Sequence, residues 1–262
     1  MTKNANGVKW FRMFMMYNCI ENIERRSEEM IDIHTHLLFG VDDGPKTIEE
    51  SIEMLKYAKE QGIDTMILTP HYRRGMFSFD KEQVLENFQK LQPYAKQIGV
   101  DLYLGTEFHV NGDMIEYLEN GRCLTLAEGS YVLTEYEYET EYSYIHKMTQ
   151  NLMLHGYTPV IAHVERYRCL VSDIAKVETL KEMGAFIQVN ADAIIGKDNW
   201  HVKQFCKKLF KFGLVDIVAS DSHGIKRRSC NMKKCREYIV KKYGESVARK
   251  VTERKPRKLL GE

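Results

Sequence analysis

Side chains that can bind metal ions or move protons stand at the ends of short apolar runs along most of this sequence. Imidazole or carboxylate groups close six such runs: His34 with His36, His71, Glu107, Glu135, His163, and Asp221 with His223. The carboxyl ends of the parallel strands of a β/α barrel meet on one face, so residues far apart in the chain would share one pocket. A pocket with so many His, Asp and Glu side chains predicts a site for several metal ions, and its expected chemistry is hydrolysis.

The first run carries two histidines, His34 and His36, whose spacing places both side chains on the same face of an extended strand. Two imidazoles a few ångström apart can bind one ion at about 2.0–2.1 Å each. Asp42 and Asp43 follow in a tight Asp-Gly turn and add two carboxylates. Each of these features alone is also common in ordinary turns and loops. It is their joint occurrence at one level of the fold that favours a metal site.

The mixture of carboxylates and imidazoles, without thiolates, suits Mn²⁺, Fe or Zn²⁺. A phosphate substrate would also need positive charge, because guanidinium groups bind phosphate oxygens in pairs. Arg166 lies three residues after His163, and Arg228 lies five residues after His223. Arg73 and Arg74, which follow His71, are also expected at the rim of the pocket. The alternative for these two, and for Arg227, is an ordinary solvated surface arginine.

The elements that must position these groups alternate between strand-like and helix-like stretches. Seven strands are expected, over residues 30–34, 65–69, 101–106, 131–136, 158–162, 185–190 and 216–220. Between them, helical spacing predicts helices over residues 47–61, 81–98, 142–155, 173–183, 199–212 and 230–243. The first helix begins with a capping box, in which Thr47 is the N-cap and Glu50 reaches back to it.

Strands that alternate with helices pair in parallel through right-handed crossovers, in an open sheet or a closed barrel. No strand is followed by GxGxxG or GxxxxGK[ST], which removes the usual reason to favour a nucleotide-binding sheet. Candidate groups at six strand ends favour the barrel. A chain of 262 residues suits one such domain, expected over residues 30–262, after an N-terminal extension over residues 1–29 that is expected to be poorly ordered.

Composition excludes several classes of protein. The formal net charge is only +1, which argues against a nucleic-acid footprint. The apolar residues 10–17 are too few to span a membrane and are followed by no signal-peptide cleavage site. We therefore expect a cytoplasmic protein without membrane insertion, whose six cysteines are reduced thiols.

A cysteine-dependent phosphatase is an alternative suggested by two Cys-x5-Arg strings, Cys19 to Arg25 and Cys230 to Arg236. Neither string contains glycines that could aim backbone N–H groups at a phosphate, and Cys230 lies in a lysine-rich helix. This interpretation is therefore disfavoured.

The chain resembles the PHP (polymerase and histidinol phosphatase) superfamily, and within it the bacterial manganese-dependent protein tyrosine phosphatases of the CpsB/YwqE type. The resemblance runs from residue 30 to about residue 260. Its motifs are residues 30–36 (MIDIHTH), 41–47 (VDDGPKT), 69–71 (TPH), 161–167 (IAHVERY), 219–223 (ASDSH) and 255–260 (KPRKLL). It implies a distorted (β/α)7 barrel that binds three metal ions. The departures from the family pattern are the leader over residues 1–29, the surroundings of Gly40, and residues 137–144.

The resemblance also implies which residues act. One ion is implied at His34, His36, Glu107 and Asp221, a second at Glu107, Glu135 and His163, and a third at Asp43, His71 and His223. Arg166 and Arg228 match the positions that hold the substrate phosphate. The general acid stays open between Asp43 and a water on the metal. Met76 and Phe77 could pack on the substrate ring or form an ordinary surface turn.

The implied activity is hydrolysis of phosphotyrosine on a bacterial tyrosine autokinase, which would connect the chain to capsule and exopolysaccharide synthesis. The main alternative is a small-molecule phosphatase, such as a histidinol-phosphate phosphatase. A PHP exonuclease module is disfavoured by the near-zero net charge. A regulatory partner of the kinase without catalysis is disfavoured because the set of candidate ligands is intact.

Overall fold

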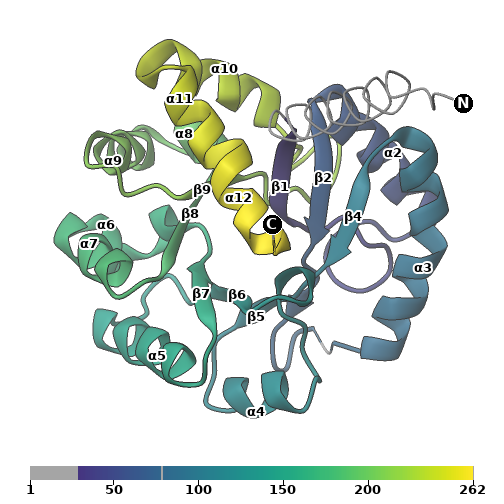
Figure 1. The fold of residues 1–262 in the computed structure, drawn as a ribbon, viewed down its shortest axis with the longest axis horizontal. Helices are drawn as coiled ribbons and strands as arrows, with labels where there is room; N and C mark the ends of the chain where they lie inside the picture. Colours follow the sequence, from purple (N-terminus) through teal and green to yellow (C-terminus); the bar gives the residue numbers. More distant parts are fainter. Residues whose placement is uncertain (1–28, 78, 262) are drawn as a thin grey trace, which may run out of the picture.

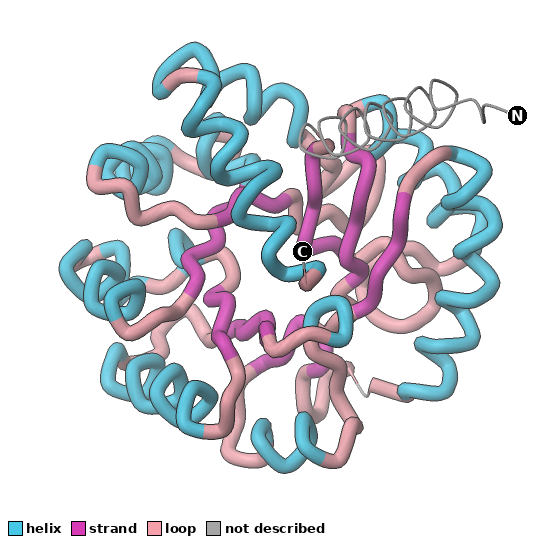
Figure 2. The backbone as a smooth tube through the Cα atoms, viewed as in Figure 1, coloured by secondary structure: helices cyan, strands magenta, loops and turns pink. Residues whose placement is uncertain are grey.

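The computed structural model describes residues 29–77 and 79–261, so most of the expected N-terminal extension lies outside the described residues. Seven parallel strand paths curl into a distorted barrel with helices outside it (Figures 1 and 2), as the sequence predicts. The strands are β1 (Met30–Thr35), β2 (Ile63–Leu68), β3 (His71–Tyr72), β4 (Asp101–Leu104), β5 (Glu107–His109), β6 (Tyr131–Glu135), β7 (Thr158–Ile161), β8 (Phe186–Asn190) and β9 (Ile217–Ala219). Two paths are broken, β2 into β3 and β4 into β5, which leaves seven.

The breaks divide the hydrogen-bonded strands into the orders β1-β2-β4 and β3-β5-β6-β7-β8-β9. Pro70, which has no N–H to donate, lies at the first break. Single backbone bonds continue across the breaks, from Thr69 N–H to the Thr35 carbonyl and from Gly105 N–H to the Leu68 carbonyl, both 2.9 Å. The barrel closes where Asp221 N–H donates to the His34 carbonyl, also at 2.9 Å.

The barrel interior is filled by small and branched apolar side chains, as expected for a packed β/α barrel. Ile31 and Ile33 of β1 belong to this cluster, together with Ile67, Leu133, Val160, Ile217 and Ala219 of the other strands and Ala162 directly after β7. A larger apolar layer lies between the strands and the surrounding helices. The polar strand ends are therefore supported from below and from outside by close packing.

All six helices expected from the sequence are present, α3 with the expected bounds and the others within two residues. They are α2 (Ile48–Glu60), α3 (Lys81–Ile98), α5 (Tyr142–Leu154), α7 (Ile174–Glu182), α9 (Trp200–Lys211) and α10 (Met232–Tyr243). Shorter helices not expected from the sequence are α4 (Met114–Glu119), α6 (Arg168–Val171), α8 (Ala191–Ile195), η1 (Leu126–Glu128) and η2 (Val164–Arg166). No described helix has the length and apolar character needed to cross a membrane.

The capping box of α2 differs from its predicted form in one bond. The Thr47 hydroxyl accepts from Glu50 N–H at 3.4 Å, as expected for an N-cap. The Glu50 carboxylate accepts from Lys46 N–H at 2.6 Å, one residue before the N-cap, and not from Thr47 as predicted. The acidic side chain still satisfies a backbone donor at the positive end of the helix.

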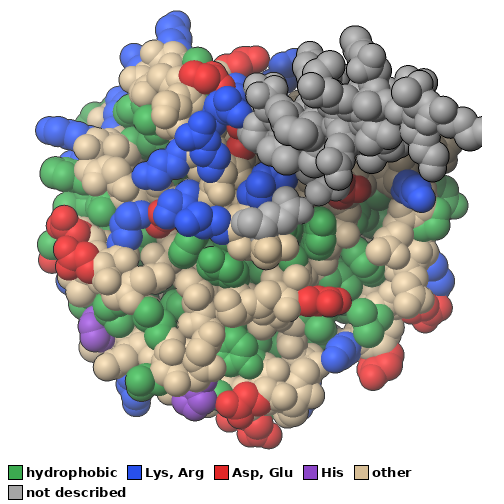
Figure 3. Space-filling model, in the orientation of Figure 1, with side chains coloured by type: hydrophobic (Ala, Val, Ile, Leu, Met, Phe, Trp, Pro, Cys, Tyr) green, Lys and Arg blue, Asp and Glu red, His purple; other side chains and the backbone are tan. Residues whose placement is uncertain are grey.

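A final helical run closes the end of the barrel opposite the candidate site. It comprises α11 (Glu245–Arg249), η3 (Lys250–Arg254), α12 (Lys255–Arg257) and η4 (Lys258–Leu260). Leu259 is fully buried and, with Leu126 of η1, completes the interior cluster. Figure 1 shows α12 crossing the barrel, and Figure 3 shows Lys and Arg side chains gathered over α11 and α12.

Candidate metal centre

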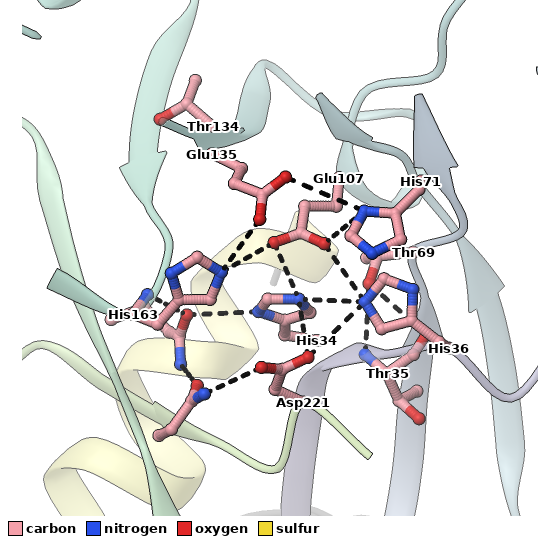
Figure 4. A network of polar contacts seen from close by, with 12 residues as sticks. His34, Thr35, His36, Thr69, His71, Glu107, Thr134, Glu135, His163 and Asp221 are labelled. Atoms are coloured by element: carbon pink, nitrogen blue, oxygen red, sulfur yellow. Dashed lines mark hydrogen bonds and ion pairs between the residues drawn. The ribbon is translucent and has the colours of Figure 1, made fainter. Parts of the chain in front are cut away.

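Glu107, which follows the break between β4 and β5, lies at the centre of a cluster of four histidines (Figure 4). Its Oε1 atom is 2.9 Å from His163 Nε2 and 3.2 Å from His34 Nε2. Its Oε2 atom is 2.9 Å from His71 Nδ1 and 3.1 Å from His36 Nε2. One buried carboxylate therefore joins groups from β1, β3 and the segment after β7, as the barrel geometry predicts.

Asp221 approaches the same cluster from the segment after β9. Its Oδ1 atom is 3.6 Å from Nε2 of both His34 and His36. Asp221 has a positive φ of 52°, and His163 one of 31°. Non-glycine residues seldom adopt this conformation, and such strain is concentrated at functional sites, where it aims a side chain.

A second group lies nearer to solvent and is built around Asp43. The Asp43 Oδ1 atom is 3.2 Å from His223 Nε2 and 3.5 Å from His71 Nε2. His36 completes this group, with its ring stacked 3.9 Å from that of His223. All three residues implied for the third ion are thus brought together, at the edge of the Glu107 cluster.

Glu135, at the end of β6, stands slightly apart from the other groups. Its Oε1 atom is 3.9 Å from His163 Nε2, and its Oε2 atom is 3.9 Å from His71 Nδ1. Burial and the neighbouring Glu107 carboxylate raise the pKa of Glu135 to about 8. The ionised form of this carboxyl group therefore requires added positive charge.

Two other ionisable groups, Glu107 and His163, are already in the form that binds a cation. Burial acts to raise the pKa of Glu107, but His34 and His71 outweigh it and hold that pKa well below its usual value. Burial and Arg166 lower the pKa of His163 to about 4, so this imidazole is neutral at neutral pH. Neutral imidazoles and ionised carboxylates are the forms that bind metal ions.

Buried side-chain atoms that make no hydrogen bond also favour metal binding at this cluster. Four buried side-chain atoms at the centre make no hydrogen bond among the described residues, even where an ion-pair distance joins them to a neighbour: His71 Nδ1, Glu107 Oε2, Glu135 Oε2 and His223 Nε2. Buried polar atoms without partners are costly unless something else coordinates them. Four groups have ligand atoms within 4.8 Å of one another: His36 with Asp43, His71 and His223; His34 with His36 and Asp221; His34 with Glu107 and His163; and His71 with Glu107 and Glu135. These are nitrogen and oxygen donors without thiolates, as Mn²⁺, Fe and Zn²⁺ accept.

Sequence reasoning missed the residues that hold the candidate ligands in place. Gln188 of β8 accepts from His163 N–H at 2.8 Å through Oε1, which also lies 3.2 Å from His34 Nδ1. Its amide donates to Asn190 at 2.8 Å, and Asn190 donates to Asp221 Oδ2 at 2.8 Å. The expected strand over residues 185–190 is the one that carries no candidate ligand. Its sequence does contain a signal for these supporting residues, namely a glutamine inside an apolar run and an asparagine at the strand end.

Asp42 is a further positioning residue. Its Oδ2 atom lies 2.7 Å from His36 Nδ1, and the carboxylate also accepts from the N–H groups of His71 and Gly44. Tyr167 plays a similar part for His163, with its hydroxyl 3.3 Å from Nδ1. These contacts fix the ring orientation of two candidate ligands.

Arg166 and Arg228 both reach Asp221 at the edge of the cluster. Arg166 Nη2 lies 2.7 Å from Oδ2, and Arg228 Nη2 lies 2.8 Å from Oδ1. Each of these arginine side chains is 42% exposed, so their guanidinium groups face both the cluster and solvent. Of the other expected rim arginines, Arg73 pairs with Glu137 and Arg74 pairs with Asp113.

A pocket of about 380 Å³ opens directly beside the cluster. Its lining includes Glu135, His163 and Arg166 of the site, and also Tyr138 and Val202. Phe77, one of the residues considered for substrate contact, instead stacks on the His71 ring at 5.2 Å. A substrate group in this pocket would touch both the cluster of candidate ligands and an arginine.

The structure argues against the cysteine alternative within the described residues. Cys230 is buried, and its burial raises the pKa of its thiol strongly, so a thiolate is disfavoured. Arg236 pairs with Glu245 and Glu253 and is not available to a phosphate at Cys230. The other string, from Cys19 to Arg25, lies outside the described residues.

Comparison with known proteins gives a consistent result. Residues 30–261 match the family model described as capsular polysaccharide synthesis, CpsB/CapC. The chain is 37% identical over 238 residues to the tyrosine-protein phosphatase CpsB of Streptococcus pneumoniae, covering 88% of this chain and 98% of the relative. It is 31% identical to the tyrosine-protein phosphatase YwqE of Bacillus subtilis, covering 86% and 89%.

Solved structures agree with these relatives. A structure from the work on YwqE of Bacillus subtilis and CpsB of Streptococcus pneumoniae, described as unique metal-dependent tyrosine phosphatases, superposes with a TM-score of 0.80 at 30% identity. The match covers 88% of this chain and 94% of that one. A phosphotriesterase homology protein of Escherichia coli, at 11% identity and a TM-score of 0.56, shares the fold alone. The chain therefore belongs to the CpsB/CapC family of capsular polysaccharide synthesis.

Proposed function

We propose that this protein is a metal-dependent phosphatase that hydrolyses phosphotyrosine on polypeptides, with Mn²⁺ as its metal. The main observation behind the proposal is that three features lie next to one another. They are a cluster of nine His, Asp and Glu side chains, two arginines at its edge, and a pocket that opens beside both. The named activity of the relatives, tyrosine-protein phosphatase, supports the choice of substrate.

The proposed metal ligands are the nine residues implied by the resemblance. They are His34, His36, Asp43, His71, Glu107, Glu135, His163, Asp221 and His223. Three ions held there would supply an acidified water and positive charge at the phosphoryl group. Glu107 would contribute to more than one of these ions, because its two oxygens face different pairs of histidines.

Arg166 and Arg228 are proposed to bind the phosphoryl oxygens of the substrate. Their guanidinium groups lie on opposite oxygens of Asp221, which orients both of them at the edge of the cluster. Guanidinium donors placed where charge develops stabilise the transition state. The leaving tyrosine has a pKa of about 10 and can depart without full protonation.

Asp43 fits the role of ligand better than that of general acid. Burial acts to raise the pKa of Asp43, but His223 and His36 outweigh it and lower that pKa below its usual value. The carboxyl group is therefore ionised at neutral pH and carries no proton to donate.

The proposed partner is a bacterial tyrosine autokinase whose phosphorylated tyrosines are the substrate in a capsule or exopolysaccharide synthesis system. The description of the matching family supports this context. We further propose that the protein acts in the cytoplasm, where free thiols such as Cys123 and Cys206 stay reduced.

The first experiment measures turnover of a phosphotyrosine peptide with Mn²⁺, with EDTA, and after thiol alkylation. Activity that needs Mn²⁺, is lost in EDTA and survives alkylation supports the proposal. Parallel assays with Fe²⁺ and Zn²⁺ test the metal. Turnover of histidinol phosphate but not of the peptide would contradict the proposed substrate and favour a small-molecule phosphatase.

A second experiment tests the arginines. Arg166→Ala and Arg228→Ala are each expected to lower kcat for the peptide by about 10²–10³, as for other removed oxyanion donors, with the metal content unchanged. Arg74→Ala, which removes an exposed arginine paired with Asp113, is the matched control. Unchanged rates in the first two variants would contradict their assigned role.

A further inference from the structure

Large apolar side chains are exposed around the open end of the metal centre. Met76, Tyr138, Trp200 and Ile225 are exposed by 61%, 60%, 66% and 37%. They lie on four segments that leave the carboxyl ends of strands, namely those after β3, β6, β8 and β9. Here these four residues are called the apolar rim. Arg166 and Arg228 come from the same end of the barrel.

Tyr138 is the member of the apolar rim that lines the pocket beside the metal centre, together with Glu135, His163 and Arg166. Its loop is held in place by two contacts with Arg168. The Tyr138 carbonyl accepts from Arg168 N–H at 3.1 Å, and the Glu139 carboxylate accepts from the Arg168 guanidinium at 3.2 Å. An aromatic ring that stays exposed on an anchored loop loses little conformational entropy when it is covered by a partner.

The start of α9 also contributes to the lining of the pocket, through Asp198, Asn199 and Val202. Asn199 caps this helix by accepting from Val202 N–H at 2.9 Å. Trp200 is the first residue of α9 and lies between these lining residues in the sequence, and its own side chain borders a neighbouring hollow with His201 and Gln204. The pocket lining thus includes two anchored segments, each of which carries an exposed aromatic side chain.

We propose that the apolar rim is the docking surface for the polypeptide that carries the phosphotyrosine, with Tyr138 and Trp200 as its main contacts. The inference rests on the proposed function and adds how the substrate is selected. A small phosphate ester would occupy only the pocket and the arginine site. It is too small to contact side chains on four separate segments as well. An extended polypeptide leaving the pocket on both sides covers them, and exposed Trp and Tyr are the residues that contribute most to such contacts.

The experiment compares kcat/KM for a phosphotyrosine peptide with that for p-nitrophenyl phosphate, which has the aryl ester but no polypeptide. Tyr138→Ala and Trp200→Ala are each expected to lower the ratio of the two values at least tenfold, mainly through the KM of the peptide. Tyr138→Phe, which keeps the ring, is expected to retain the ratio. Tyr94→Ala and Phe212→Ala, exposed residues on α3 and at the end of α9, are the controls.

The outcomes separate this inference from the proposed function. No hydrolysis of either substrate by the unaltered protein would contradict the proposed function itself. Peptide hydrolysis by the unaltered protein, with the ratio in both rim variants equal to that in the controls, would overturn the docking surface alone. An equal fall on both substrates would also overturn it, because the residues would then act on the catalytic cluster. Metal content and thermal unfolding of each variant establish that it is folded.

Discussion

The Oδ2 atom of Asp42 lies 2.7 Å from Nδ1 of His36, and this contact sets which nitrogen of the imidazole is turned to the candidate metal centre. With Nδ1 engaged by the carboxylate, Nε2 is directed at Glu107, 3.1 Å away. Burial acts to lower the pKa of His36, but Asp42 and Glu107 outweigh it and raise that pKa well above its usual value. Such carboxylate-histidine pairs orient metal ligands and increase their basicity.

Asp42→Asn is expected to weaken metal binding by about 10- to 100-fold, the usual effect of removing a carboxylate behind a histidine ligand. The amide is nearly isosteric, so the effect reports the loss of charge and of a strong acceptor. Metal affinity is measured by competition with a chelator of known affinity. Asp64→Asn, at a surface pair with Lys59, is the control. An affinity equal to that of the unaltered protein would mean that His36 needs no such support.

Gln188 connects two candidate ligands that are far apart in the sequence, His34 and His163. Gln188→Leu leaves the buried His163 N–H without its acceptor, which costs about 1–3 kcal/mol. We expect the free energy of unfolding to fall by this amount in EDTA, and metal binding to weaken as well. Urea unfolding with and without Mn²⁺ measures both effects. Gln92→Leu, at an exposed position of α3, should change neither, and a Gln188→Leu protein as stable as this control would refute the bridging role.

Metal binding is expected to strengthen as the pH rises from about 6 to about 8. In the metal-free protein the pKa of Glu135 is raised to about 8, and that of His36 is raised well above its usual value. Both groups therefore hold protons at neutral pH that an incoming cation must displace. His163, with its pKa lowered to about 4, is already neutral and contributes no proton.

Calorimetric titration in two buffers of different ionisation enthalpy measures these protons. At about pH 7 we expect release of more than one proton per protein on loading with Mn²⁺, and less release as the pH is raised. Affinity that is independent of pH over this range would contradict the assignment of Glu135 and His36 as ligands.

The positions of the candidate ligands could be predicted because strand ends are readable from short apolar runs, and a barrel brings those ends together. The supporting residues could not be predicted in the same way. Asp42 and Asp43 are adjacent and chemically identical in sequence, and only the turn at Gly44 decides which one faces His36 and which one faces His223. Gln188 is a single amide whose partners lie 154 and 25 residues away.

Helices outside the regular alternation were also missed for physical reasons. The run from α11 to η4 contains Pro256 and is rich in charged residues, so its sequence shows no clear apolar stripe. It is helical because Leu259 and Val251 are buried, Leu259 in the barrel interior and Val251 in the layer around the strands. Tertiary burial of these and other side chains of the run decided the structure, and such burial is not local information.

Gly44 holds the Asp42–Asp43 turn against the first strand through a close backbone approach. A Cβ atom at this position would lie 2.0 Å from the His36 carbonyl oxygen, which no side-chain adjustment can relieve. Gly44 N–H also donates to Asp42 Oδ1 at 2.9 Å. Gly44→Ala must therefore move the turn, and with it both carboxylates.

We expect Gly44→Ala to lower phosphatase activity by about 10²-fold, the usual effect of displacing reacting groups by about 1 Å. The loss should include weaker metal binding, because Asp43 would move away from His71 and His223. Gly112→Ala is the matched control, since no atom lies within 4 Å of its added Cβ and its φ is not positive. Activity and metal affinity of Gly44→Ala equal to those of Gly112→Ala would show that the turn is not needed to position the ligands.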